Sequence, residues 1–308
     1  MSLHVYANIV TPFGTAANNR AETEGNITTL QKILWMGQPH STVSAEAIRF
    51  ALRQRLAELD ESGTNRQWNE MSRTNSWQDP EFLGWNSETG KTYIDDDLLG
   101  YMRAEAAKVD GPGTTRVRRA VLEVTRAVSL TPWTGDVTFN AASPGATPSA
   151  SRGKNKYKNP VPYGSEVHAT RYQFGTSLTP ESLREKSRAA KAIEALCHLG
   201  SVAGNQGRFL FDFSPEAVVF RLTHDPAPRI LYCFESNDFG KSVCVDQLLT
   251  RLDTGDIKPE ELICGVSDRE SALAQQLQNR GIEPVGVKAA CSSLINRMTQ
   301  ALEVEAGR

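Results

Sequence analysis

The sequence predicts a globular protein of mixed α and β structure, an α+β fold. An alternating run of apolar residues at positions 3–10 is typical of a strand, and apolar residues at helical spacing over positions 45–59 predict an amphipathic helix. The chain has 308 residues, of which 39% are hydrophobic and 23% charged. A chain of this length and composition buries a substantial core, so wholesale disorder is excluded.

Composition excludes several classes of protein. The net charge of −2 excludes a globally basic nucleic-acid coat. No stretch approaches the ~20 apolar residues of a membrane helix, and residues 1–10 do not have a signal peptide's pattern, so we expect a cytoplasmic protein without membrane contact. Five cysteines without a C-x-x-C pair predict reduced thiols and no zinc site. We expect no metal and no cofactor.

The first elements follow from local patterns. The strand at 3–10 stops at Pro12, and the polar stretch 14–25 is predicted to be a loop. Ser44 precedes the helix at 45–59 as a plausible N-cap, because its hydroxyl can accept a hydrogen bond from the first helical turn.

The middle of the chain is less regular. Residues 60–92 contain three tryptophans without a sustained period, which predicts an irregular insertion; the tryptophans are stacking platforms or, more simply, buried anchors. Asp95, Asp96 and Asp97 resemble the acidic first turn of a helix, where the helix dipole favours negative charge. Residues 120–130 are rich in β-branched side chains and predict a strand.

The sharpest break in composition lies at residues 144–164. Seven of these 21 residues are proline or glycine and only Val161 is aliphatic, so the segment cannot hold a core. Its flanks at 137–139 and 167–174 look like strands. The pattern predicts a long hairpin over about 140–166.

Further along, the pattern alternates helices and short strands. The sequence predicts helices at 181–199, 243–252, 267–280 and 289–302, and strands at 217–222, 230–234 and near 285–287. The glycine-rich run 200–208 follows the first of these helices.

Positive charge is concentrated in one region. Residues 111–175 contain nine basic and three acidic residues, a local charge of +6, and the rest of the chain sums to −8. Concentrated positive charge is what a polyanion-binding face needs, because each neutralised phosphate releases condensed counterions. The alternative is a merely solvated loop, and for the basic loop alone that interpretation is the better one.

Three segments, in this order, resemble a known family. The first is Asn18-Asn19-Arg20, followed by residues 30–38 and V-S-A-E-A-I-R-F-A-L-R at 43–53; the second is A-V-S-L-T at 127–131 and V-H-A-T-R-Y-Q-F-G-T-S-L at 167–178 around the basic insertion; the third is V-A-G-N-Q-G-R-F-L-F-D-F-S-P at 202–215. Together they resemble the DevR-like family, the CRISPR-associated backbone subunits of type I Cascade complexes in the RAMP superfamily. The resemblance runs over roughly residues 3–235.

The resemblance implies a modified ferredoxin-like or RRM-like palm with inserted fingers and a long hairpin thumb. The palm would comprise residues 1–59, 93–139 and 167–308, the last with a C-terminal α/β extension, the fingers residues 60–92 and the thumb residues 140–166. It further implies a non-catalytic subunit that binds CRISPR guide RNA, stacks with further copies of itself along the spacer, supports pairing with a target DNA strand and contacts other Cascade subunits.

Ser44, Arg49 and Arg53 are the strongest candidates for guide contacts. A serine hydroxyl beside the free N–H groups of a helix N-terminus is a ready phosphate ligand, and arginines on the next turns can reach the same anion. Helix statistics alone favour a simple cap and two solvated arginines; the resemblance reverses that preference. We leave out Glu46, where relatives often carry glutamine, because its charge would repel a phosphate.

The resemblance implies further RNA contacts from loops. In the first loop Asn18, Asn19 and Arg20 donate to phosphate or ribose, although a local turn explains Asn18 about as well. A backbone cradle, or alternatively a helix C-cap and linker, follows the helix at 181–199. The candidates in the cradle are Gly204, Asn205, Gln206 and Arg208, and those in the thumb are Lys154, Lys156, Tyr157 and Lys158. His40, near the helix at 45–59, is a further candidate.

An enzyme is the main alternative. Some members of the superfamily cleave RNA, which makes a metal-dependent endoribonuclease acting at Glu22 or Glu24 the second hypothesis. The five histidines are scattered and form no H-x-x-x-H pair; His40 is more simply an RNA contact, and His168 is expected to be structural. A small-molecule α/β enzyme is disfavoured, because no glycine-rich phosphate loop follows a strand.

Overall fold

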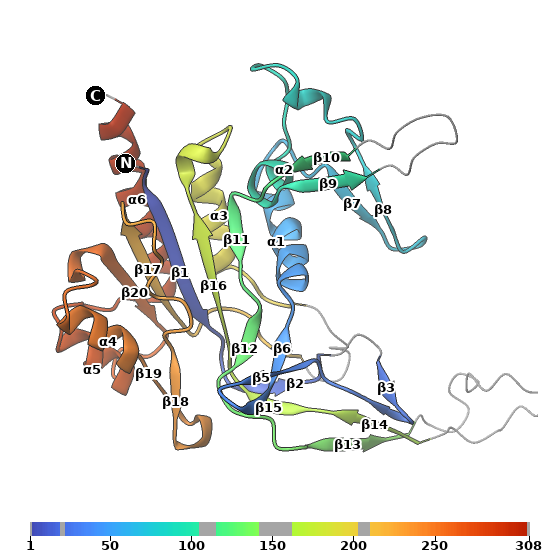
Figure 1. The fold of residues 1–308 in the computed structure, drawn as a ribbon, viewed down its shortest axis with the longest axis vertical. Coiled ribbons are helices and arrows are strands. Elements are labelled where there is room, and N and C mark those ends of the chain that lie inside the picture. The colour runs from blue at the N-terminus through green and yellow to red at the C-terminus, as the bar shows by residue number, and fades with distance from the viewer. Residues whose placement is uncertain (1, 19–21, 105–114, 142–161, 203–209, 307–308) are drawn as a thin grey trace, which may run out of the picture.

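The computed structural model describes residues 2–18, 22–104, 115–141, 162–202 and 210–306 (Figure 1). An eight-stranded antiparallel sheet with helices packed around it confirms the α+β class. The predicted first strand is β1 (His4–Val10), which lies in the middle of the sheet between β16 (Tyr172–Leu178) and β17 (Ala217–Thr223). The N-terminal strand is therefore held by partners from the second half of the chain.

The strands of the main sheet follow an order far from that of the sequence. From edge to edge they are β20 (Leu262–Val266), β17, β1, β16, β12 (Ala127–Ser129), β6 (Gln38–Val43) and β5 (Lys32–Trp35), and β11 (Leu122–Val124) also pairs with β16. The strand expected at 120–130 is thus two short strands, interrupted at Thr125, whose N–H donates to the Gly175 carbonyl.

Smaller sheets surround the main one. Their strands are β2 (Gly14–Ala16), β3 (Thr23–Glu24), β4 (Ile27–Thr28), β7 (Arg66–Asn69), β8 (Thr74–Trp77), β9 (Tyr101–Ala104), β10 (Thr115–Arg118), β13 (Val137–Asn140), β14 (Tyr163–Glu166), β15 (His168–Thr170), β18 (Glu235–Asn237) and β19 (Ser242–Cys244). The first loop thus contains short strands, and the irregular insertion contains the β7–β8 hairpin.

Two hydrophobic cores cover the two faces of the main sheet. The helices are α1 (Ala45–Leu59), α2 (Ile94–Leu99), α3 (Arg188–Cys197), α4 (Asp246–Asp253), α5 (Ala272–Gln278) and α6 (Val287–Ala306). Along β1, Val5, Ala7 and Ile9 pack into the core with α1, α3 and α6, and Tyr6 and Val10 pack into the core with α4 and α5. This alternation is the period of a strand buried on both faces. None of the helices in the described ranges is long and apolar enough to cross a membrane.

Helix α1 has the predicted bounds. The Ser44 hydroxyl accepts a hydrogen bond from the Ala47 N–H at 3.3 Å and caps the helix. Ile48, Leu52 and Leu56 are fully buried at helical spacing, and each such side chain contributes about 1.5–3 kcal/mol of burial free energy.

Helix α3 is shorter than predicted. The sequence predicts a helix at 181–199, but a 3₁₀ turn at Pro180–Ser182 comes first and the α-helix begins at Arg188. The N–H groups of Arg184 and Glu185 donate instead to the Asp97 carboxylate, at 3.0 and 3.1 Å. A buried side chain from another segment therefore takes the amides that would start the helix.

The strand predicted at 230–234 is absent. Arg229 and Tyr232 have left-handed backbone angles, with φ of 56° at both, which no strand accommodates. The Tyr232 N–H donates to the Asn8 side chain and the Phe234 N–H to Gln173, so the sheet's side chains satisfy this segment.

The C-terminal helices keep their places with shifted ends. A strand, β19, occupies the start of the helix predicted at 243–252, and α4 begins at Asp246. Helix α5 is limited to seven residues by its cap at Ser271, and α6 extends beyond 289–302 at both ends. The short strand expected near residue 285 is a single parallel bridge between Gly265 and Val285.

Candidate nucleic-acid interface

A cleft of about 450 Å³ opens between α1, α2, the β7–β8 hairpin and the β9–β10 hairpin. Its walls bring together four arginines, namely Arg49, Arg53, Arg66 and Arg118. The acidic side chains in the lining are Glu46, Asp95 and Asp96. Figure 1 shows the two hairpins together at the end of the molecule near α2. The sequence analysis identified only the two arginines on α1.

Arg49 and Arg53 lie one turn apart on α1, as the sequence predicts. The Arg53 Nε donates to Asp95 at 3.1 Å, and the Asp95 side chain is 1% exposed. This ion pair holds Arg53 in the wall of the cleft. The Arg49 Nε is buried and has no hydrogen-bond partner among the described residues. A bound anion would satisfy it, because a buried donor without an acceptor costs about 1–3 kcal/mol.

Arg66 and Arg118 come from segments whose position the sequence did not predict. The Arg66 guanidinium lies 5.5 Å from the Trp77 ring, and the Arg118 guanidinium lies 4.3 Å from the Trp85 ring. Partial burial and the like charge of Arg53 lower the pKa of Arg66, but an arginine stays protonated in proteins, so its charge adds to that of α1. Only the folding of the insertion and of the β9–β10 hairpin against α1 places these arginines in one cleft.

The three aspartates of α2 are buried, which the sequence analysis did not predict. A helix does begin there, but Asp95, Asp96 and Asp97 are at most 2% exposed rather than solvated at a helix start. Asp97 accepts from Arg118 at 2.8 Å and from Arg188 at 3.0 Å. The aspartates therefore tie α1, α3 and the arginines of the cleft together.

Asp96 makes the charge of the cleft sensitive to pH. Burial and the neighbouring charge of Asp95 raise the pKa of Asp96 to about 7. Its carboxylate accepts a hydrogen bond from the Asn65 side chain at 2.9 Å. Protonation near neutral pH removes one negative charge from the cleft, which favours an anionic ligand at lower pH.

Three other predicted contacts are engaged inside the protein. Ser44 caps α1, which was the alternative interpretation of this residue. Its oxygen accepts a hydrogen bond in the cap, so the hydroxyl hydrogen can still be donated at the helix N-terminus. Asn18 is buried and donates to the Thr42 carbonyl at 2.8 Å, tying the first loop to β6. His40 is buried, with its Nδ1 2.7 Å from the Ser129 carbonyl oxygen. Contacts of these three residues with RNA stay predictions.

The remaining predicted contacts lie outside the described residues. They are Asn19 and Arg20, the thumb residues Lys154, Lys156, Tyr157 and Lys158, and the cradle residues Gly204, Asn205, Gln206 and Arg208. Segments that flank these residues are described. At the base of the predicted hairpin β13 pairs with β14, so the second strand is Tyr163–Glu166, whereas residues 168–174 pair with other strands. Phe211 and Phe213, which follow the glycine-rich run, are buried against Tyr172.

A buried hydroxyl on β6 contacts a buried imidazole on β15. The Ser41 Oγ is 2.7 Å from His168 Nδ1 and 2.7 Å from the Tyr172 hydroxyl. Burial lowers the pKa of His168 to about 4, so the ring is neutral at physiological pH. Both residues are enclosed in the core, which agrees with the structural role expected for His168.

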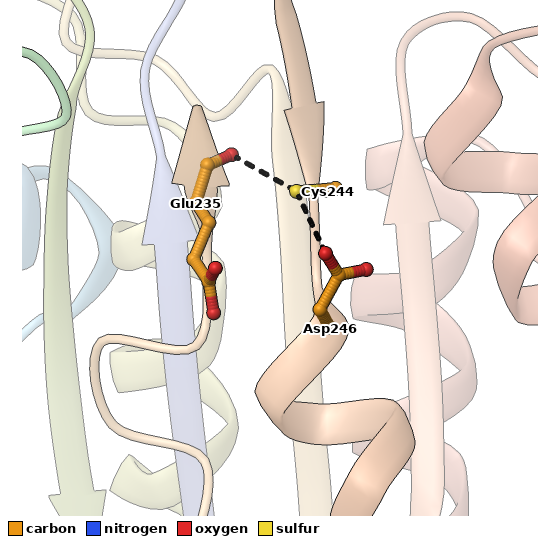
Figure 2. A group of neighbouring side chains, drawn as sticks. All are labelled: Glu235, Cys244 and Asp246. Atoms are coloured by element: carbon orange, nitrogen blue, oxygen red, sulfur yellow. Dashed lines mark hydrogen bonds between the residues drawn. The ribbon is translucent and has the colours of Figure 1, made fainter. Parts of the chain in front are cut away.

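One group in the described ranges brings three potential metal ligands close together. Glu235, Cys244 and Asp246 place their ligand atoms within 4.8 Å of one another (Figure 2). Burial and the charge of Asp246 raise the pKa of Cys244 to about 11, so the sulfur is a protonated thiol. Its Sγ lies 3.7 Å from the Asp246 carboxylate and 3.8 Å from the Glu235 carbonyl, and either oxygen accepts its hydrogen. Thiol hydrogen bonding therefore accounts for the arrangement.

Comparison with known proteins agrees with the resemblance in the sequence. Residues 11–239 match the family described as "CRISPR-associated negative auto-regulator DevR/Csa2". The chain is 58% identical over 302 residues to a Myxococcus xanthus (strain DK1622) protein described as "CRISPR-associated protein Cas7/Cst2/DevR", covering 97% of this chain and 98% of that protein.

The fold is also similar to chains of solved structures. One, from a "CRISPR RNA-guided surveillance complex, pre-nicking", has a TM-score of 0.56 at 12% identity, covering 98% of this chain and all of that chain. Another, from a "CRISPR RNA-guided surveillance complex", has a TM-score of 0.55 at 14% identity, covering 97% of this chain and all of that chain.

Proposed function

Because the chain belongs to the CRISPR-associated DevR/Csa2 family, we propose that it is a non-catalytic backbone subunit of a type I Cascade surveillance complex. In this proposal it binds guide RNA, and further copies line up along the spacer beside other Cascade subunits. The assembled row supports pairing of the guide with a target DNA strand. The main sheet with its helices acts as an RRM-like palm, residues 60–92 as fingers and residues 140–166 as a thumb.

The observation that supports the proposal most directly is the cleft lined by Arg49, Arg53, Arg66 and Arg118, called here the arginine cleft. Guanidinium groups bind phosphate in a planar, two-pronged geometry, and they keep their charge at all physiological pH values. Asp95 fixes Arg53 before a ligand arrives, which lowers the entropic cost of binding. Phosphate contacts fix the position of the strand without reading its sequence, as a subunit that must accept any spacer requires.

RNA binding by variants tests the role of the cleft. We expect replacement of Arg49 and Arg66 together by alanine to weaken binding of a single-stranded RNA at least about tenfold. The slope of log affinity against log salt should also fall by about 0.7 for each phosphate that the protein no longer neutralises. The matched control is Arg269→Ala, an exposed arginine paired with Glu283. Wild-type affinity and salt dependence in the double variant would remove the cleft from the RNA-binding surface.

A cleavage assay separates this proposal from the endoribonuclease hypothesis. Glu24 lies on β3 and Glu22 just before it; both are exposed, and neither belongs to the group of potential metal ligands drawn in Figure 2. We expect guide RNA and complementary RNA to stay intact with Mg²⁺. If the RNA is cleaved and Glu22→Ala or Glu24→Ala abolishes the cleavage, the protein is a nuclease and the scaffold proposal is wrong.

A further inference from the structure

A second cavity, of about 550 Å³, lies beside the core that contains α4 and α5. The rings of Trp35 and Tyr232 lie 5.0 Å apart in its wall. At its rim the β5–β6 turn exposes the apolar side chain of Met36, which is 82% exposed. Aromatic walls with an exposed apolar rim are typical of a pocket that receives a side chain from a partner.

The cavity favours a positively charged occupant. Glu235 is the one acidic side chain in its lining, and no lysine or arginine in the described ranges lines it. One carboxylate oxygen of Glu235 and the hydroxyl of Ser236 are buried without a hydrogen-bond partner among the described residues. The last torsion of a glutamate is soft, so either oxygen can turn toward the cavity. The Asp246 carboxylate lies close to Glu235 and adds negative charge (Figure 2).

Arginine matches this site better than lysine does. Its guanidinium offers five N–H donors, enough for a carboxylate and a hydroxyl together. Its planar face stacks on tryptophan and tyrosine rings, whose π-electrons attract the cation.

Among the described residues, an exposed arginine in the β7–β8 turn can supply such a guanidinium. Arg73 is exposed in the turn of the β7–β8 hairpin, and no hydrogen bond, ion pair or ring contact of its side chain is found within the described ranges. Met71 in the same turn is 95% exposed. Figure 1 shows this hairpin projecting away from the main sheet. The turn therefore presents a cation beside an apolar side chain, the complement of a carboxylate beside an apolar rim.

We propose that Arg73 of one copy of this chain inserts beside Glu235 in the cavity of the next copy. The inference rests on the proposed function, because it names the surfaces by which copies on one RNA meet. The hairpin turn and the cavity are different patches of the molecule, so the contact is heterologous and leaves one of each free at the two ends of a row. Contacts of this type build open rows, which match a ligand as extended as an RNA strand.

Charge reversal tests the contact in the presence of RNA. Copies bound per RNA are counted by sedimentation velocity for Arg73→Glu, for Glu235→Arg and for the double variant. We expect each single reversal to weaken association between copies at least about tenfold, as disruption of a close interfacial charge pair does, and the double variant to recover most of that association. Glu235→Gln, which is gentler on folding, should weaken association in the same direction. Arg269→Glu with Glu283→Arg, an exposed pair within one copy, is the matched control.

RNA affinity, measured in the same variants at a protein concentration too low for association, separates the two proposals. Intact RNA binding with unchanged association in the single variants would overturn the contact but leave the proposed function standing. Weakened association by Glu235→Arg that Arg73→Glu does not restore would assign the cavity to another basic segment, such as residues 152–158, and would also overturn it. Failure of the wild-type protein to bind RNA would overturn the proposed function itself.

Discussion

Asp97 is expected to be the single carboxylate on which the stability of this fold depends most. Its two oxygens accept from four donors: the side chains of Arg118 and Arg188 and the N–H groups of Arg184 and Glu185. The Arg188 side chain is 1% exposed and Asp97 is fully buried. In Asp97→Asn one oxygen becomes an amide that faces two donors, and two arginines are left without a counter-charge at this position.

The expected cost is about 3–5 kcal/mol, the range for breaking a buried ion pair. Glu185 and Asp60 also lie near Arg188 and keep part of its charge balanced, which places the estimate toward the lower end of that range. The assay is urea unfolding followed by tryptophan fluorescence. Glu123→Gln, which removes the partner of the 87% exposed Arg119, is the control and should cost at most about 1 kcal/mol. An unfolding midpoint for Asp97→Asn equal to that of the control would refute the reasoning.

Single residues give three further predictions. The pKa of Asp96 is raised to about 7, so RNA affinity should fall as this carboxyl ionises between about pH 6 and 8. Between about pH 4 and 7 only the folded state holds the proton, so the free energy of unfolding should fall as pH rises through this range and then level off. Asp96→Asn should flatten both profiles, with RNA affinity measured by anisotropy and stability by urea unfolding. Gly100→Ala should destabilise the fold and weaken RNA binding, since φ is +67° and a Cβ would lie 2.4 Å from the Arg118 carbonyl; Gly255→Ala, with similar φ but open space, should be milder in both assays. Phe213→Ala should cost about 3–5 kcal/mol in urea unfolding, because the ring is buried among Tyr172, Phe174 and Phe211.

Local signals in the sequence predicted some elements nearly to the residue. The strand at 3–10 and the helix at 45–59 with its Ser44 cap were both predicted, because periodicity and capping depend on neighbours within a few residues. The two arginines on α1 were found for the same reason, since a spacing of four puts them on one face of a helix. The order of the three motif-bearing segments along the chain was also sufficient to detect the family resemblance.

Long-range contacts decided the rest. The start of α3 is set by Asp97, which accepts hydrogen bonds from the backbone N–H groups of Arg184 and Glu185. These residues are far from Asp97 in the sequence, so no local pattern predicts the contact. Arg66 enters the cleft because the insertion folds back on α1, and Arg118 enters it because the β9–β10 hairpin does so too. Local hydrogen bonds and periodicity can therefore be predicted from the sequence. The site instead depends on which distant segments lie together, and burial of apolar residues from the whole chain determines that arrangement.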